Sequence, residues 1–130
     1  MKIALFDNIV LDLVGPLIVS SILFFEAVAV ILEAVIIYFL LEREAVKAFV
    51  ASFSANLITG LLNIIYLFVF WQDVSIYTRK AVVMTVALLI NILVEALVIK
   101  RFYKTVDNRK ILGVSTLMNL ASYGVLLLLV

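Results

Sequence analysis

Residues 52–63, SFSANLITGLLN, decide the fold, because polar residues recur at helical spacing inside an apolar run. At about 100° per residue, five polar or small residues of this stretch fall on one face of an α-helix, and the other face is mainly aliphatic and aromatic. The residues on the polar face are Ser52, Asn56, Thr59, Gly60 and Asn63. The stretch therefore predicts a helix that buries a polar face in apolar surroundings.

The composition around this stretch is that of a membrane protein. Apolar residues make up 67% of the 130 residues, charged residues only 15%, and the mean hydropathy is +1.31. These values lie far outside the usual balance of a soluble domain. A transmembrane helix needs roughly 20 mainly apolar residues, and such runs occupy residues 17–41, 46–70, 81–99 and 111–130. The sequence predicts an all-α, multi-pass protein of the cell membrane with four transmembrane helices, surrounded by the lipid bilayer.

Several kinds of chemistry are excluded by residues that the chain lacks. It has no cysteine and no histidine, so disulfides, thiolate or imidazole metal sites and nucleophiles paired with histidine are ruled out within the chain. We predict no enzymatic activity, no cofactor and no metal centre. A net charge of +1 gives no indication of a nucleic-acid partner. Asp7 and Asp12 interrupt the pattern of a cleaved leader, so we expect the N-terminus to be retained.

The first 15 residues differ from the four apolar runs. Ile3, Phe6, Val10 and Leu13 share one side of a helix, and residues 15–16, Gly-Pro, then favour a break. Residues 1–15 are therefore predicted to form a short amphipathic helix at the membrane interface. The alternative is that they are the frayed start of a long first helix.

The polar pattern occurs twice. It returns 63 residues after Ser52 as Ser115, Asn119 and Ser122, and each copy follows a glutamate in apolar sequence. Residues 33–37, EAVII, align with residues 95–99, EALVI. Either the chain contains two similar tandem hairpins, residues 16–71 and 72–130, or the recurrence is chance in a biased composition. Since each repeat would hold two spans, the hairpins would be related by a pseudo-two-fold axis along the membrane normal.

The distribution of lysine and arginine predicts the orientation. The first and third turns share one side of the membrane and hold seven of these residues, against three on the other side. The positive-inside rule then places both hairpin turns in the cytoplasm and both termini outside. Attraction to anionic lipid headgroups is a further prediction for the basic third turn, which holds Lys100, Arg101, Lys104, Arg109 and Lys110.

Glutamates in the apolar runs are the strongest candidates for a site. Glu26 and Glu33 are seven residues apart and so share a helix face, and a charge at the centre of a membrane helix costs roughly 2.5–3.5 kcal/mol. Counting from the first turn places Asn56 at the depth of Glu33 in the adjacent helix, and an amide-to-carboxyl hydrogen bond is expected. In the second half, Asn119 is expected near Glu95, unless Glu95, five residues before Lys100, reaches the interface instead.

The predicted ion- or substrate-binding residues are expected on the inner faces of all four spans. They are Glu26, Glu33, Asn56, Thr59, Asn63, Asn91, Glu95 and Asn119. Small residues that let helix backbones approach are expected to serve helix packing, and these are Ser52, Gly60, Ser115 and Ser122.

Two functions fit these residues. Carboxylate, amide and hydroxyl oxygens suit a proton or a hard cation such as Na⁺, Mg²⁺ or Ca²⁺, which favours a small transporter, channel or ion-binding membrane protein. Alternatively, protonated glutamates bonded to asparagines only hold helices together, as in a structural or accessory subunit that docks a partner. Because four spans form a thin wall for a pore, we expect a homo-oligomer or a larger membrane complex.

Overall fold

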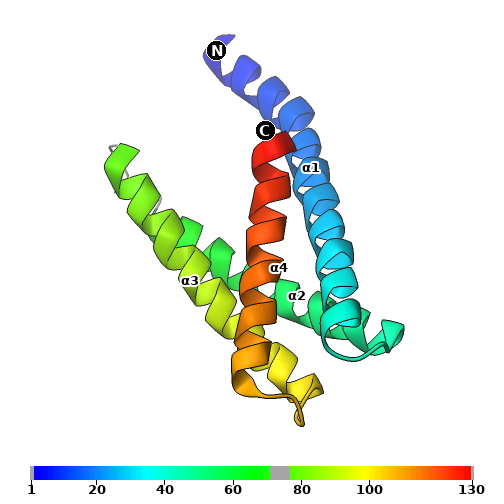
Figure 1. Ribbon diagram of the computed structural model, residues 1–130. Helices are drawn as coiled ribbons and strands as arrows, with labels where there is room; N and C mark the ends of the chain where they lie inside the picture. The colour runs from blue at the N-terminus through cyan, green and yellow to red at the C-terminus, as the bar shows by residue number, and fades with distance from the viewer. Residues whose placement is uncertain (1, 71–76, 130) are drawn as a thin grey trace.

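The structure is a computed structural model that describes residues 2–70 and 77–129. It consists of four α-helices, α1 (Lys2–Leu40), α2 (Ala45–Phe70), α3 (Tyr77–Phe102) and α4 (Asn108–Leu129), and no strand occurs within the described ranges (Figure 1). The all-helical prediction is confirmed, and each helix contains one of the four apolar runs almost completely. The predicted boundary between residues 71 and 72 lies outside the described residues.

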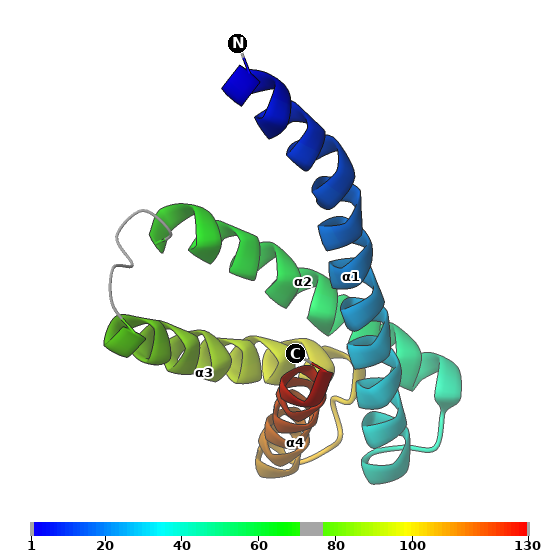
Figure 2. The ribbon, with the colours of Figure 1, turned by 90° about the horizontal axis from the view of Figure 1, so that it is seen from above.

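The first helix differs from the prediction for the N-terminus. α1 continues from Lys2 to Leu40 without a break at Gly15 and Pro16. The described part of the separate segment predicted for residues 1–15 is therefore the first part of a long helix. A proline inside a helix removes one backbone hydrogen bond and bends the helix, but does not always end it. Figures 1 and 2 show the first part of α1 bending away from the rest.

The four helices pack in a ring in which each helix contacts two others. α1 contacts α2 and α4, and α3 contacts the same two helices, whereas the diagonal pairs α1–α3 and α2–α4 do not pack within the described chain. The helices converge at the end that carries the α1–α2 and α3–α4 turns and diverge toward the end that carries the N-terminus (Figures 1 and 2). Packing is therefore tightest near the two turns.

Burial follows the same gradient. The hydrophobic core lies between the two turns, and it is formed by Ile37, Ala48, Ala51, Ile99, Tyr103, Ile111, Val114 and Met118. On α2, Ala48, Ala51 and Ala55 are almost completely buried and share one helix face. Small side chains on this face allow the backbones of neighbouring helices to approach α2 closely.

Contacts between the two turns strengthen this end. The Lys47 ammonium is 2.5 Å from a Glu42 carboxylate oxygen and lies 4.5 Å from the centre of the Tyr103 ring. Burial raises the pKa of the Tyr103 phenol above its ordinary value, so this ring stays neutral under the cation. Lys47 therefore connects the first turn to the second.

The basic turn is partly used within the fold. The Lys100 ammonium donates to the carbonyl oxygens of Lys104, at 3.0 Å, and Val106, at 2.5 Å. Lys100 therefore stabilises the turn itself. The other four residues predicted to meet lipid headgroups are exposed, and they are Arg101, Lys104, Arg109 and Lys110.

Within the described chain, no neighbouring helix approaches Gly60 closely. A Cβ atom built at this position meets no other atom within 4 Å. The close contacts of α2 are made by its alanines, on the part of the helix nearer the turn.

We therefore expect Gly60→Ala to leave the free energy of unfolding unchanged or to raise it by up to about 1 kcal/mol, because alanine favours a helix over glycine. Thermal unfolding of the purified protein in detergent measures this. A clear loss of stability would show that another molecule packs closely against Gly60.

Candidate functional site

Glu33 of α1 lies at the centre of the bundle and is only 2% exposed. Its Oε2 atom accepts a hydrogen bond from the Asn56 amide of α2 at 2.5 Å, and its Oε1 atom accepts one from the Ser122 hydroxyl of α4 at 2.6 Å. The Ser52 hydroxyl is 3.4 Å from Oε2. The bond to Asn56 was predicted from matching depths, and it is present. Glu33 thus joins three helices.

Glu95 of α3 is the second buried carboxyl group and is also 2% exposed. Its Oε2 atom accepts from the Asn119 amide of α4 at 2.5 Å, and its Oε1 atom is 3.4 Å from the Thr59 hydroxyl of α2. The predicted contact with Asn119 is present, and Glu95 lies in the interior instead of reaching toward Lys100. Glu95 of α3 therefore joins α2 and α4.

Two serines and the same two asparagines fix the positions of these groups. The Ser52 hydroxyl donates to the Val30 carbonyl at 2.9 Å, and the Ser115 hydroxyl donates to the Ile92 carbonyl at 2.7 Å. Val30 and Ile92 each precede a glutamate by three residues. Both asparagine amides also donate to the carbonyl of the serine one turn earlier, each at 3.0 Å. The amides are thereby held with their nitrogen atoms toward the carboxyl groups.

These groups together form what we call the carboxyl seam, which consists of Glu33, Ser52, Asn56, Thr59, Glu95, Ser115, Asn119 and Ser122. Each carboxyl group contacts an asparagine from the helix next to it in the chain and a hydroxyl from the other helix pair. The seam therefore links all four helices through the centre of the ring.

Not every predicted site residue belongs to the seam. Glu26 is exposed, and Asn63 is half-buried; neither takes part in these hydrogen bonds. Asn91 is buried and lies near the Tyr123 phenol of α4. Tyr123 lies four residues after Asn119 and therefore on the same face of α4.

The hydroxyls of Thr59 and Ser122 make contacts that the sequence did not indicate. Each follows an asparagine of the seam by three residues, which rotates it around the helix toward the next neighbour. Thr59 therefore reaches Glu95 and Ser122 reaches Glu33, each across to the other helix pair. Ser122, predicted to serve only packing, is a direct partner of a carboxyl group.

The seam contains two carboxyl groups. In the described part of the chain, acidic residues do not gather in groups of three or more that could hold a metal. Two carboxyl groups with amide and hydroxyl neighbours can bind, share or release protons. Both glutamates are almost completely buried.

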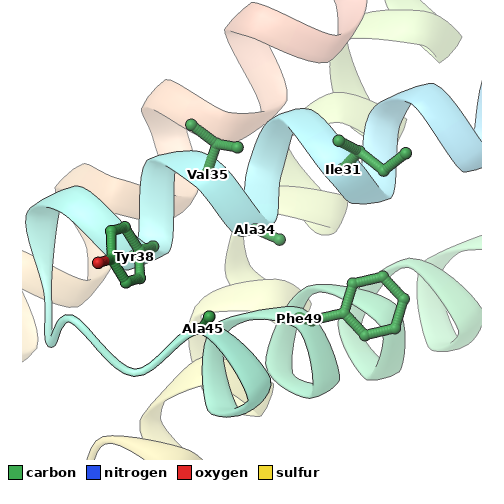
Figure 3. A pocket seen from close by; sticks show the side chains of 6 residues that line it. All are labelled: Ile31, Ala34, Val35, Tyr38, Ala45 and Phe49. Atoms are coloured by element: carbon green, nitrogen blue, oxygen red, sulfur yellow. The ribbon is translucent and has the colours of Figure 1, made fainter.

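A pocket of about 410 Å³ lies away from these groups, between α1 and α2 (Figure 3). It contains no carboxyl group and is lined by Ile31, Ala34, Val35, Tyr38, Ala45 and Phe49. Ile31, Val35 and Phe49 are exposed, so the pocket opens on the outer surface of the bundle. It is a shallow apolar surface feature and does not lead to the seam.

Two described segments are long and apolar enough to cross a membrane, Leu23–Leu40 of α1 and Ala45–Ile65 of α2. Comparison of the chain with protein-family models, with characterised proteins and with solved structures finds no match. Fold and site define a four-helix protein with two buried carboxyl groups, each hydrogen-bonded to side chains of neighbouring helices.

Proposed function

We propose that this is a multi-pass integral membrane protein in which all four helices cross the bilayer. The observation that carries the proposal is an inverted distribution of side chains, with carboxyl, amide and hydroxyl groups inside and large apolar side chains outside. Leu23, Leu57, Leu97 and Leu120 of the four helices are 64%, 54%, 70% and 55% exposed. Soluble proteins rarely expose continuous apolar surface on this scale, whereas lipid covers it at no cost.

The same proposal includes the predicted topology. The α1–α2 and α3–α4 turns lie at one end of the molecule (Figure 1). The contact between Lys47 and the Tyr103 ring joins them. Their seven lysines and arginines favour the cytoplasmic side. Ser52 makes the same kind of hydrogen bond in the first hairpin as Ser115 makes in the second, and Asn56 the same kind as Asn119. This correspondence supports an internal duplication of one hairpin.

Cysteine labelling tests this topology sharply, because the natural chain has no cysteine. In intact cells, an impermeant maleimide is expected to label Lys2→Cys, and to label Thr105→Cys only after the membrane is opened. The opposite pattern would overturn the orientation. Release of the protein from membranes by alkaline carbonate would overturn the membrane location itself.

Within the membrane, the role that the geometry supports best is that of a non-catalytic structural or accessory subunit. Both carboxyl groups are enclosed and hydrogen-bonded to neighbouring helices, as expected for groups that hold spans together. The helices diverge away from the turns, and their exposed apolar faces are available to another membrane segment. Purification from native membranes in a mild detergent tests this role, because a stoichiometric partner or a defined homo-oligomer is expected. A monomer that purifies alone would contradict it.

A small proton or cation transporter is the second candidate. It is favoured by two carboxyl groups in one apolar seam and by the exposed Glu26, two helical turns from Glu33 on the side where the helices diverge. Transport would require the seam to open. Ion flux into liposomes that is abolished by Glu33→Gln, with the folded protein retained, would favour transport over the structural role; flux equal to that of empty liposomes would exclude it.

A further inference from the structure

Hydroxyl hydrogens in the seam are mostly committed to backbone carbonyls. The hydroxyl of a serine or threonine has a single hydrogen to donate. That of Ser52 points to the Val30 carbonyl at 2.9 Å, and that of Thr59 has the Ala55 carbonyl of its own helix at 3.1 Å. Both hydroxyls lie farther, at 3.4 Å, from the carboxyl groups. Toward the glutamates, these two oxygens are therefore placed to accept.

Each oxygen of Glu33 has one close donor. One oxygen faces the Asn56 amide at 2.5 Å and the other faces the Ser122 hydroxyl at 2.6 Å. The amide cannot turn over without placing its oxygen against the Ser52 carbonyl, to which its nitrogen donates. A carboxylate that accepts from both sides matches this environment.

Glu95 is different at one oxygen. Its Oε2 atom accepts from the Asn119 amide, but its Oε1 atom has only the Thr59 hydroxyl oxygen at 3.4 Å. A hydrogen on Oε1 would find an acceptor there, whereas a carboxylate would leave this oxygen without a committed donor. We infer that the Glu33–Glu95 pair is a proton-binding site that holds one proton, carried on Oε1 of Glu95 and donated to Thr59, with Glu33 as the carboxylate.

The charges around Glu95 agree with a bound proton. The ionisable groups that act on it are Glu33 and Glu26 of α1 and, from α4, the Tyr123 phenol; α2 presents only the neutral Thr59. No lysine or arginine of the described chain is among them. Two carboxylates that act on each other in an apolar interior repel, and one proton bound by the pair removes most of that repulsion. The inference depends on hydrogen-bond geometry and not on whether the protein transports anything.

Paired glutamine variants test the assignment, because glutamine has the shape of a protonated carboxyl group. In Glu95→Gln, the new amide can donate to Thr59 while its oxygen accepts from Asn119, so the Tm in detergent is expected to change little. In Glu33→Gln, the new oxygen must face Asn56, so the new NH2 group lies against Ser122 and the hydrogen bond that Ser122 donates to Glu33 is lost. A fall in Tm of at least about 4 °C is expected. Equal losses in the two variants, or a larger loss in Glu95→Gln, would overturn the assignment.

Infrared spectroscopy of the purified protein at neutral pH gives a second measurement that does not depend on stability. A protonated carboxyl C=O band is expected in the natural protein, unchanged in the control Glu26→Gln and absent in Glu95→Gln. Absence of the band from the natural protein, or its persistence in Glu95→Gln, would overturn the inference.

Discussion

Replacing Glu33 with alanine is expected to lower the free energy of unfolding by about 2–3 kcal/mol. Asn56 and Ser122 would both lose their acceptor in a site closed to water, and a buried donor left unpaired costs about 1–3 kcal/mol. Little is regained by removing the carboxyl group if the helices cross the bilayer as proposed, because separated helices would still hold Glu33 within the membrane. Unfolding of the purified protein by denaturing detergent measures the change.

Glu26→Ala is the matched control, since Glu26 lies on the same helix but is exposed and outside the seam. Its effect is expected to stay within about 0.5 kcal/mol, as for most surface substitutions. If the two alanine variants lost the same stability, the hydrogen bonds of Glu33 would contribute nothing particular to the fold.

Enlarging the small face of α2 is the second substitution with a large expected effect. Ala51 is completely buried in the core between the two turns, and α2 packs against both α1 and α3. Leucine at this position would force the helices apart, and overpacking of this kind typically costs 1–3 kcal/mol. We expect Ala51→Leu to lower the free energy of unfolding by about 3 kcal/mol, measured in the same detergent assay.

Val50→Leu controls for the added bulk, because Val50 is the adjacent residue and is exposed. We expect this variant to behave like the natural protein. Equal tolerance of the two leucines would mean that α2 does not approach its neighbours through its alanines.

Much of the fold was predictable because it follows from the hydropathy of each run and from the number of residues between each polar residue and the nearest turn. The apolar runs at 46–70 and 111–130 correspond closely to α2 and α4, since length and hydropathy are read directly from the sequence. The pairing of Glu33 with Asn56 followed from counting residues outward from a short turn, because a turn of four residues allows little freedom in the relative depth of two helices.

The rest depends on how each helix is rotated, which the sequence does not state. Thr59 and Ser122 bond to the carboxyl group of the other helix pair because the ring of four helices places it within reach. Gly60 is small, but its side of α2 faces open space. Glu26 shares a face with Glu33, yet it is exposed, because the helices have diverged at its level. Such differences arise from packing, which neither periodicity nor spacing determines.

The link between the two helix pairs is tested most directly by a double-mutant cycle on Glu33 and Ser122. The free energies of unfolding of Glu33→Ala, Ser122→Ala and the double variant are expected to give a coupling of about 1 kcal/mol, in the range measured for hydrogen bonds between membrane helices. A parallel cycle with Thr116→Ala, whose hydroxyl donates to the Leu112 carbonyl of its own helix, is expected to give a coupling near zero. A coupling near zero for Glu33 and Ser122 as well would contradict a carboxyl seam that joins the four helices.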